Sequence, residues 1–449
     1  MKVKRLKMQS FRGIGDLTLE FGETSPTALI GINGVGKSSI LDCLAILLSQ
    51  MIREIAYAES RRINRIQGGV NFYLGSQISN EYEKSIPGKP DIEKRFFSKE
   101  DITNGHKKTH NGIKIFLQSR EVSWFLTNFS KERNEEPNKE NAELNAVSQD
   151  IYRQWEANPK FNLPLAVYYP VKRSVLGIDM EITETHLLKQ IDAYDQALNG
   201  VQISFHRFFQ WFRSLEDLEN EERRDNPEFK TQQLEAVRQS IYSLIPGFSN
   251  LRVRRSPLRM TVRKQGEELT VNQLSDGEKC LLAMVGDLAR RLAIANPGLT
   301  EPLEGEGVVL IDEIELHLHP KWQREIIPAL TRTFPNCQFI VTTHSPQVLS
   351  QVKPEGIYIL EKTHEGVVAK KPESSFGRDS NRILEDLMGV PERPQEIKES
   401  LLELFRLIDA GNIEGARQLR QQLAIEIGAD EPEFVKADVL IRRKEILNR

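Results

Sequence analysis

Short apolar runs alternate with segments of helical periodicity along much of the chain. Four of these runs have the length and continuous hydrophobicity of strands buried on both faces, and they occupy residues 27–32, 305–313, 338–345 and 356–361. Apolar residues recur at helical spacing after the first run, from 40 to 52, and after the second, up to about residue 333. Strands that alternate with helices predict a mostly parallel sheet.

Two other parts of the chain have the pattern of antiparallel strands. Residues 1–26 have the order strand, turn and strand, and residues 251–275 predict strands around a turn at Gln265 and Gly266. The segment NLPLAVYYPVKR, residues 162–173, returns to the character of a buried strand. We therefore expect an α/β fold with a mostly parallel core and an antiparallel β lobe.

The remaining segments predict helical additions and one stretch of little order. Apolar residues have helical spacing from His186 to Leu244 and again after Phe376, whereas residues 51–165 are mixed and polar. The prediction is for four parts: an N-terminal lobe with a partly disordered insert, a helical insertion, a C-terminal lobe and a helical C-terminal region. They occupy residues 1–180, 181–250, 251–375 and 376–449.

Composition excludes several classes of protein. The 449 residues include 28% charged side chains, with a net charge of −3, so any contact with nucleic acid must come from a local patch. No stretch of about 18 apolar residues is present, and the three cysteines, Cys43, Cys280 and Cys337, are too few for a disulfide framework. We expect a cytoplasmic protein without a membrane span, whose cysteines are small buried hydrophobic residues.

A phosphate-binding loop follows the first buried run. The sequence GINGVGKSS satisfies the pattern G-x-x-x-x-G-K-[ST], in which glycines let backbone N–H groups surround phosphates, the lysine reaches the β and γ oxygens, and the hydroxyl ligates Mg²⁺. The strand before it and the helix after it are the required context. ATP and Mg²⁺ are therefore the expected ligands, and the nucleotide-binding residues are Asn33, Gly34, Gly36, Lys37, Ser38 and Ser39.

Two carboxylates end the run VVLIDE, at the edge of a parallel sheet where ligands bind. Asp312 is expected to hold the Mg²⁺ together with Ser38. Glu313 is expected to accept a proton from the attacking water or to orient it. His344, in TTHSP after the next strand, matches the switch histidine of ABC ATPases, which hydrogen-bonds the γ-phosphate.

The sequence LSDGEK, residues 274–279, resembles the ABC signature in its SMC-like form. There, a serine and a glycine at the start of a helix contact the γ-phosphate bound by the other subunit. Ser275, the free N–H groups and the helix dipole make an anion site. Because Ser275 and Gly277 lie between the phosphate loop and the Asp-Glu pair, in the order that ABC proteins require, we expect a nucleotide site shared by two copies of the chain.

Other residues allow more than one interpretation. Arg12, in FRGIGDL, stands where SMC-like and RecF-like ATPases carry a basic residue near the nucleotide, but a surface arginine would look the same. His317 and His319 have no third metal ligand, which favours a dimer contact or a structural role. Three glutamines are candidates for the Q-loop, and spacing does not decide among Gln67, Gln77 and Gln118.

A basic segment precedes the signature. It contains no acid and either binds DNA, meets acids of a partner, or forms a solvated hairpin face. Its six basic residues are Arg252, Arg254, Arg255, Arg259, Arg263 and Lys264. Because no aromatic residues are interleaved with them, the interpretation as a DNA contact is the weaker one.

The motifs extend over nearly the whole chain, from FRGIGDLTLEF through GINGVGKSS, LPLAVYYPVKR, LSDGEK, IDEIELHLHP and TTHSPQVL to FGRDSNRILEDLMGVPER. This set resembles the PtuA-type ATPases of Septu anti-phage systems and their retron-associated relatives. The resemblance implies an ABC-type ATPase fold and a homodimer or higher homo-oligomer. It also implies a separate HNH nuclease, PtuB, through which DNA could be contacted.

Two nuclease types are not expected within this chain. The residues after His344 read as helices without the acidic pair of a Toprim domain. His106, His110 and Asn111 are expected in a polar loop, GHKKTHNG, without the ββα arrangement of an HNH nuclease. Two alternatives to a Septu-like protein remain. One is a RecF or SMC-like DNA clamp, and the other is the nucleotide-binding subunit of a membrane transporter, against which the large insert and helical tail argue.

Overall fold

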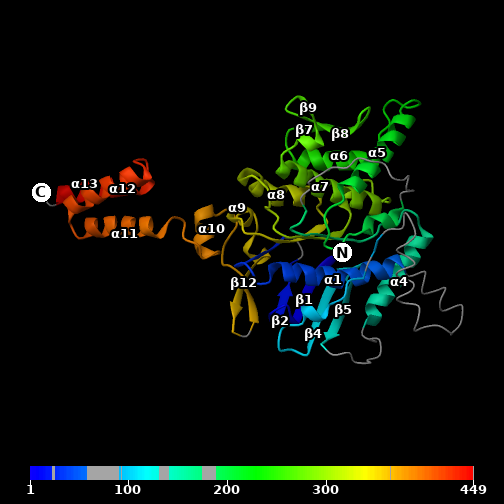
Figure 1. The fold of residues 1–449 in the computed structure, drawn as a ribbon, viewed down its shortest axis with the longest axis horizontal. Coiled ribbons are helices and arrows are strands. Elements are labelled where there is room, and N and C mark those ends of the chain that lie inside the picture. Colours follow the sequence, from blue (N-terminus) through cyan, green and yellow to red (C-terminus); the bar gives the residue numbers. More distant parts are fainter. Residues whose placement is uncertain are drawn as a thin grey trace. The chain divides into compact units, whose positions relative to one another are not determined.

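The computed structural model describes residues 1–22, 26–57, 91–92, 94–130, 141–173, 189–364 and 366–447. These residues form two compact units, Met1–Arg378 and Asp379–Arg449 (Figure 1). The finer division of the chain into four parts remains a prediction.

The first unit is built on a six-stranded sheet in the order β13-β12-β3-β11-β10-β6. All neighbouring strands are parallel except β13, which pairs antiparallel with β12. Every residue of β3, β6 and β10 is buried, as expected for strands covered on both faces. The six strands are β3 (Thr27–Ile30), β6 (Leu165–Tyr169), β10 (Gly307–Ile311), β11 (Cys337–Thr342), β12 (Ile357–Thr363) and β13 (Gly366–Lys370).

An antiparallel sheet in the order β2-β1-β4-β5 forms the β lobe. Helix α1 (Lys37–Ala56) lies between the two sheets, where it contacts β4 of the lobe and β6, β10 and β11 of the parallel sheet (Figure 1). Trp124 of β5 donates from its indole to the carbonyl of Leu47 in α1, at 3.0 Å. The strands are β1 (Lys2–Phe11), β2 (Ile14–Glu20), β4 (Lys108–Leu117) and β5 (Arg120–Phe129).

The expectation of little order through residues 51–165 was wrong for much of that range. Beyond α1 it contains β4, β5 and α4 (Ala142–Ala157), and His110 and Asn111 belong to β4 rather than to a polar loop. Burial alternates with period two along β4, which buries Ile113, Ile115 and Leu117 and leaves Lys114 and Phe116 on the other face. The charged stretch KERNEEPNKE, residues 131–140, lies outside the described residues.

A helical pair packs against the helix that carries the signature, and a third sheet packs against the helical pair. Helices α5 and α6 both contact α7, and a side chain at Gly286 of α7 would meet the Phe208 ring of α5 at 2.9 Å. The predicted turn at Gln265 and Gly266 is confirmed by their positive φ angles of 50° and 92°. These elements are α5 (Phe205–Glu222), α6 (Gln232–Leu244), β7 (Phe248–Arg255), β8 (Leu258–Lys264), β9 (Glu267–Thr270) and α7 (Asp276–Ala295).

Two further helices of the first unit follow strands of the parallel sheet. Helix α8 (Pro320–Thr333) lies between β10 and β11 in the chain, and α9 (Pro346–Leu349) follows β11. Within the part of the chain that the structure describes, no helix is long and apolar enough to span a membrane.

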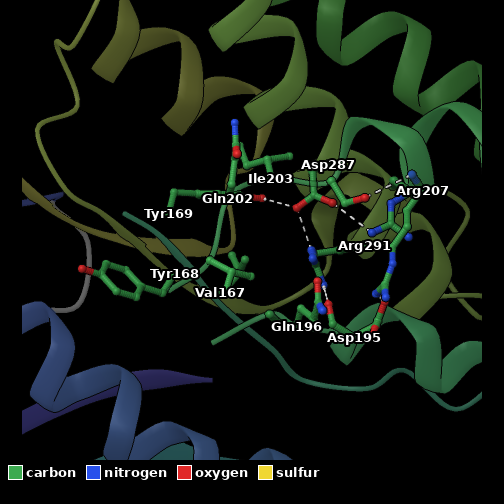
Figure 2. A pocket seen from close by; sticks show the side chains of 14 residues that line it. Val167, Tyr168, Tyr169, Asp195, Gln196, Gln202, Ile203, Arg207, Asp287 and Arg291 are labelled. Atoms are coloured by element: carbon green, nitrogen blue, oxygen red, sulfur yellow. Dashed lines mark hydrogen bonds and ion pairs between the residues drawn. The ribbon is translucent and has the colours of Figure 1, made fainter. Parts of the chain in front are cut away.

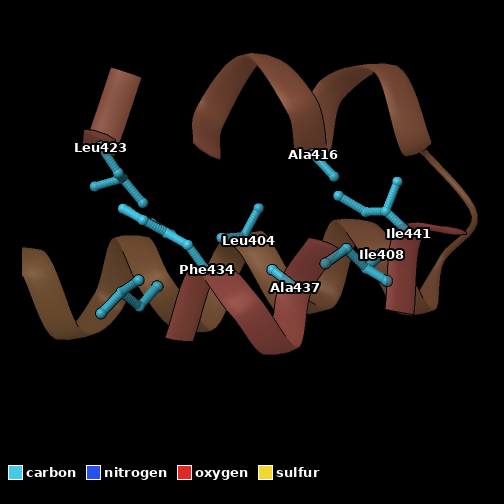
Figure 3. Packing of buried hydrophobic residues seen from close by; sticks show 8 residues of the cluster. Leu404, Ile408, Ala416, Leu423, Phe434, Ala437 and Ile441 are labelled. Carbon is cyan, nitrogen blue, oxygen red and sulfur yellow. The ribbon is translucent and has the colours of Figure 1, made fainter. Parts of the chain in front are cut away.

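The second unit is helical, as predicted for the end of the chain. Its core is formed by buried faces of three helices, with Leu404, Ile408, Leu423, Phe434 and Ile441 at its centre (Figure 3). Arg420 of the second of these helices pairs with Asp438 of the third, at 2.9 Å. The helices of the unit are α10 (Ser380–Asp386), α11 (Gln395–Asp409), α12 (Ile413–Ile427) and α13 (Pro432–Leu447).

Candidate functional site

Three predicted motifs meet at one edge of the parallel sheet. Strand β11 pairs with β3 on one side and with β10 on the other, all in parallel. The carboxyl ends of the three strands therefore lie side by side, which is where ligands bind in such sheets. The phosphate loop leaves β3, Asp312 and Glu313 leave β10, and His344 follows β11. The topology thus assembles residues that are up to about three hundred positions apart.

The phosphate loop has the backbone conformation that its glycines predict. Gly31, Gly34 and Gly36 have φ angles of 146°, 77° and 108°, which side chains disfavour. A side chain at Gly31 would also meet the carbonyl oxygen of Leu360 at 2.5 Å. The loop ends at Gly36, the residue that precedes α1. The loop N–H groups and the start of α1 form the concave donor set that suits phosphates.

Lys37 is buried at the start of α1. Its ammonium donates to the carbonyls of Gly31 and Ile32, at 2.8 and 3.1 Å. Burial lowers the pKa of Lys37, while Asp312, Glu313 and Glu315 oppose this by favouring the charged form. The loop therefore holds a cation at its centre, which is the charge that β and γ phosphate oxygens require.

Ser38 and Asp312 lie together, as expected for a shared Mg²⁺ site. The Ser38 hydroxyl donates to Asp312 Oδ1 at 3.1 Å, and Thr342 donates to the same oxygen at 2.6 Å. No group of three or more histidine, cysteine or acidic side chains that could hold a metal occurs among the described residues. A hydroxyl and one carboxylate fit Mg²⁺, which takes few protein ligands and completes its shell with water and substrate phosphates.

Glu313 has an unusual backbone at the end of β10. Its φ is 48°, a left-handed conformation that costs about 1 kcal/mol for a residue other than glycine. Its N–H donates to the Thr342 hydroxyl at 2.7 Å. The side chain is half-buried at the same edge as Lys37 and Ser38. This is the place where a carboxylate could act on a water beside the γ-phosphate.

Residues near His344 connect the ends of β10 and β11. The His344 N–H donates to Glu315 Oε1 at 2.5 Å, and the Ser345 hydroxyl donates to Gln323 of α8 at 2.7 Å. His344 is half-buried. Its loop is therefore fixed to the segment that follows the Asp-Glu pair.

The signature forms the start of α7. Ser275 is exposed and caps the helix by accepting from the Glu278 N–H at 3.4 Å, while Glu278 accepts from the Ser275 hydroxyl at 2.9 Å. Burial opposes ionisation of Glu278, but Lys264 and Ser275 outweigh it and lower its pKa. A side chain at Gly277 would lie 2.4 Å from the carbonyl oxygen of His317, so only glycine fits there.

Arg12 lies beside the phosphate-loop helix. Its guanidinium pairs with Asp42 of α1 at 2.7 Å and with Asp101 at 2.6 Å. Burial by itself would lower the pKa of Arg12, but the two carboxylates outweigh it and raise it. Strand β2 also approaches the phosphate loop, because a side chain at Gly36 would meet Ile14 at 3.0 Å. The role of Arg12 in nucleotide binding stays a prediction.

The basic segment is largely paired within the chain. Arg252 and Arg254 both pair with Glu268, Arg255 pairs with Glu216 and Asp217, and Lys264 pairs with Glu278. These ion pairs fit the interpretation of the basic segment as a hairpin face better than its interpretation as a DNA contact. Contact with DNA stays a prediction.

The structure shows the positions of His317 and His319 but describes only one of the three candidate Q-loop glutamines. His319 caps the N-terminus of α8, because its ring accepts from the Lys321 N–H at 3.3 Å. His317 has a positive φ of 64°. Gln118 is a turn residue between β4 and β5, with φ of 49°. Gln67 and Gln77 lie outside the described residues, so the Q-loop glutamine remains undecided.

Three residues that the sequence analysis did not assign contribute to the site. Thr342 bridges Asp312 and Glu313, Glu315 holds the His344 loop, and Arg173 donates to the backbone carbonyls of Asp312 and Glu313. Thr342 and Glu315 are within three residues of predicted site residues, and this proximity in sequence could have marked them as candidates for the site. Arg173 ends the segment 162–173, and nothing in its spacing relates it to Asp312.

A buried charge network joins the signature helix to the edge strand of the sheet (Figure 2). Asp287 of α7 accepts from Tyr169 of β6 at 3.0 Å, from Arg291 at 2.7 Å and from Arg290 at 2.9 Å. Burial by itself would raise the pKa of Asp287, but Arg291 and Arg290 outweigh it and lower the pKa to about 2. The network therefore anchors α7 to β6, next to the strand that carries Asp312.

We expect Asp287→Asn to lower the free energy of unfolding by about 3–5 kcal/mol at pH 7, because two buried arginines lose their shared carboxylate. The folded pKa of about 2 lies below the unfolded value of about 3.9, so the stabilisation is present above about pH 4 and is lost as the pH falls toward 2. Urea unfolding at several pH values checks both parts. Asp217→Asn, at a half-exposed ion pair, is the control and should cost under about 1 kcal/mol. A small, pH-independent effect at Asp287 would contradict the expectation.

Comparison with known proteins identifies the family. Residues 27–350 match the family described as "AAA domain, putative AbiEii toxin, Type IV TA system". The chain is 30% identical to "Retron Ec83 probable ATPase" of Escherichia coli, over 99% of this chain and 87% of that protein. It is 24% identical to "Septu protein PtuA" of Bacillus thuringiensis, over 92% of this chain and 90% of the relative.

A solved SMC head domain derived from Pyrococcus furiosus has a similar fold, at 15% identity and a TM-score of 0.45, over 82% of this chain and 96% of that one. The fold class is the predicted one, an α/β fold with a mostly parallel sheet, an antiparallel lobe and added helices. The chain belongs to this AAA-domain family, together with the retron probable ATPases, and it is an ATPase.

Proposed function

We propose that two copies of this chain enclose two molecules of Mg-ATP, and that the nucleotide state of the dimer controls a separate HNH nuclease in anti-phage defence. The observation that carries the first part is the sheet edge at which Lys37, Ser38, Asp312, Glu313 and His344 meet. Family membership supports the second part, because relatives of the chain are retron and Septu proteins.

Each residue at the edge has a role in this proposal. Loop N–H groups and Lys37 bind the phosphates, and Ser38 and Asp312 hold the Mg²⁺, which would neutralise charge that develops on the phosphates. Glu313 orients the attacking water and accepts its proton. His344 hydrogen-bonds the γ-phosphate and so distinguishes ATP from ADP.

Ser275 and Gly277 serve the partner subunit's nucleotide. Ser275 is exposed at the N-terminus of α7, a 20-residue helix whose first N–H groups and dipole attract an anion. ATP then bridges the two subunits, and hydrolysis weakens the bridge. A nuclease that docks on only one of the two states is thereby switched.

A plasmid cleavage assay tests control of a nuclease. The chain alone should hydrolyse ATP and leave DNA uncut, and cutting should appear when a separate HNH nuclease is added and should respond to ATP supply. The Lys37→Ala variant, whose binding of ATP should be much weaker, is the matched control and should lose the response at ATP concentrations that saturate the wild type. Metal-dependent cutting by the chain alone would contradict the proposal. Strong, salt-dependent duplex binding by the chain alone would instead favour a DNA clamp.

A further inference from the structure

A buried arginine follows β6 and reaches the backbone of the Asp312–Glu313 pair. Arg173 is only 1% exposed. Its Nη1 donates to the carbonyl of Asp312 and its Nη2 to the carbonyl of Glu313. Nη1 also lies 3.3 Å from the carbonyl of Pro170, at the end of β6. The guanidinium therefore binds backbone carbonyls at the point where the chain leaves the sheet after β10.

Both carbonyls lie past the last paired residues of β10; Arg173 donates to each of them, and the Glu313 carbonyl also accepts from the Leu316 N–H at 2.9 Å. The Asp312 N–H makes a hydrogen bond to the carbonyl of Tyr169 at 2.9 Å, next to the last paired residues of β10 and β6. The chain then turns, since Glu313 has a left-handed φ of 48°. Buried backbone carbonyls are nearly always hydrogen-bonded. Arg173 provides the Asp312 carbonyl with a donor and ties it to the Glu313 carbonyl through one planar group, which a lysine ammonium could not reproduce.

The other side of the same backbone is also fixed. The Glu313 N–H donates to the Thr342 hydroxyl at 2.7 Å, and that hydroxyl donates to Asp312 Oδ1 at 2.6 Å. Thr342 and Arg173 thus hold Glu313 from its N–H and its carbonyl. Because the direction of the Cα–Cβ bond follows from the backbone conformation, these contacts set the direction in which the Glu313 side chain leaves the main chain.

We propose that Arg173 is a positioning residue for ATP hydrolysis, because its hydrogen bonds to the carbonyls of Asp312 and Glu313 keep Glu313 in the left-handed conformation that directs its carboxylate to the attacking water. The inference rests on the role proposed for Glu313. Arg173 acts through the main chain, so it should affect the chemical step more than the binding of ATP.

The test compares Arg173→Met, which keeps the volume but removes the donors, with Arg173→Lys, which keeps a charge and one donor group. For Arg173→Met we expect kcat to fall about 100-fold while the Kd for ATP stays within about twofold. Arg173→Lys should restore part of the lost kcat. Cys280→Ala is the matched control, because the Cys280 thiol lies beside the same guanidinium, and its kcat should stay within about twofold of wild type.

A double variant separates this inference from the role of Glu313. Arg173→Met should cause no further loss of turnover in a Glu313→Gln background, since the carboxylate that it positions is already gone. Near wild-type turnover of Glu313→Gln would refute the proposed function of Glu313. Inactive Glu313→Gln with wild-type kcat in Arg173→Met would overturn only the inference on Arg173. If Arg173→Met does not fold, Arg173→Lys decides: a lower kcat at unchanged Kd supports positioning, and a parallel loss of ATP binding overturns it.

Discussion

Glu313→Gln should bind ATP as the wild type does but turn it over about 100- to 10,000-fold more slowly. The amide keeps the shape of the side chain and loses only the ability to accept a proton. Lys37, Ser38 and Asp312, which are proposed to bind the nucleotide and its metal, are unchanged. ATP should therefore remain bound, and the variant should accumulate as an ATP-bound dimer.

Lys37→Ala is the matched contrast to Glu313→Gln. It removes the buried ammonium that the phosphate loop surrounds. The loss of charge-assisted hydrogen bonds to phosphate should weaken ATP binding by about 100-fold. Calorimetric titration with ATP and size-exclusion chromatography distinguish the two variants. Turnover of Glu313→Gln close to that of the wild type would remove Glu313 from the role proposed for it.

Local motifs made the phosphate loop predictable from sequence. Loop glycines, a lysine and a hydroxyl between a strand and a helix define the conformation within nine residues, and the structure shows the positive φ angles at Gly31, Gly34 and Gly36. The parallel direction of β3, β11 and β10, which brings their carboxyl ends to one edge, also follows from alternating strands and helices. Sequence alone could therefore place Lys37 and Asp312 at one edge.

Contacts between distant segments could not be predicted in the same way. Arg173 reaches Asp312 across 139 positions, and the two meet only because β6 pairs with β10 at the edge of the sheet. The strand order was not available from the sequence pattern. Strands β4 and β5 were missed for a different reason: their short alternating segments lie between long polar stretches, which dominated the interpretation of residues 51–165.

The shared nucleotide site predicts complementation between two inactive variants. In a dimer of Lys37→Ala with Ser275→Arg, one site combines the intact phosphate loop of the Ser275→Arg subunit with the intact signature of the other subunit. The second site carries both defects. With random pairing in an equal mixture, about a quarter of all sites are intact, so ATPase activity should return to about that fraction if the sites act independently.

A control mixture distinguishes complementation from simple mixing. Lys37 and Glu313 lie at the same sheet edge of one subunit, so mixing Lys37→Ala with Glu313→Gln leaves both sites defective. That mixture should stay inactive. Ser275→Arg also removes the cap of α7, at a cost of about 1 kcal/mol, so its folding is checked by thermal unfolding.

The most direct measurement is therefore steady-state ATPase activity of the two mixtures, with heterodimers verified by differently tagged subunits. The shared site predicts recovered activity for Lys37→Ala with Ser275→Arg and none for Lys37→Ala with Glu313→Gln. Heterodimers of the first pair that remain as inactive as either variant alone would contradict it.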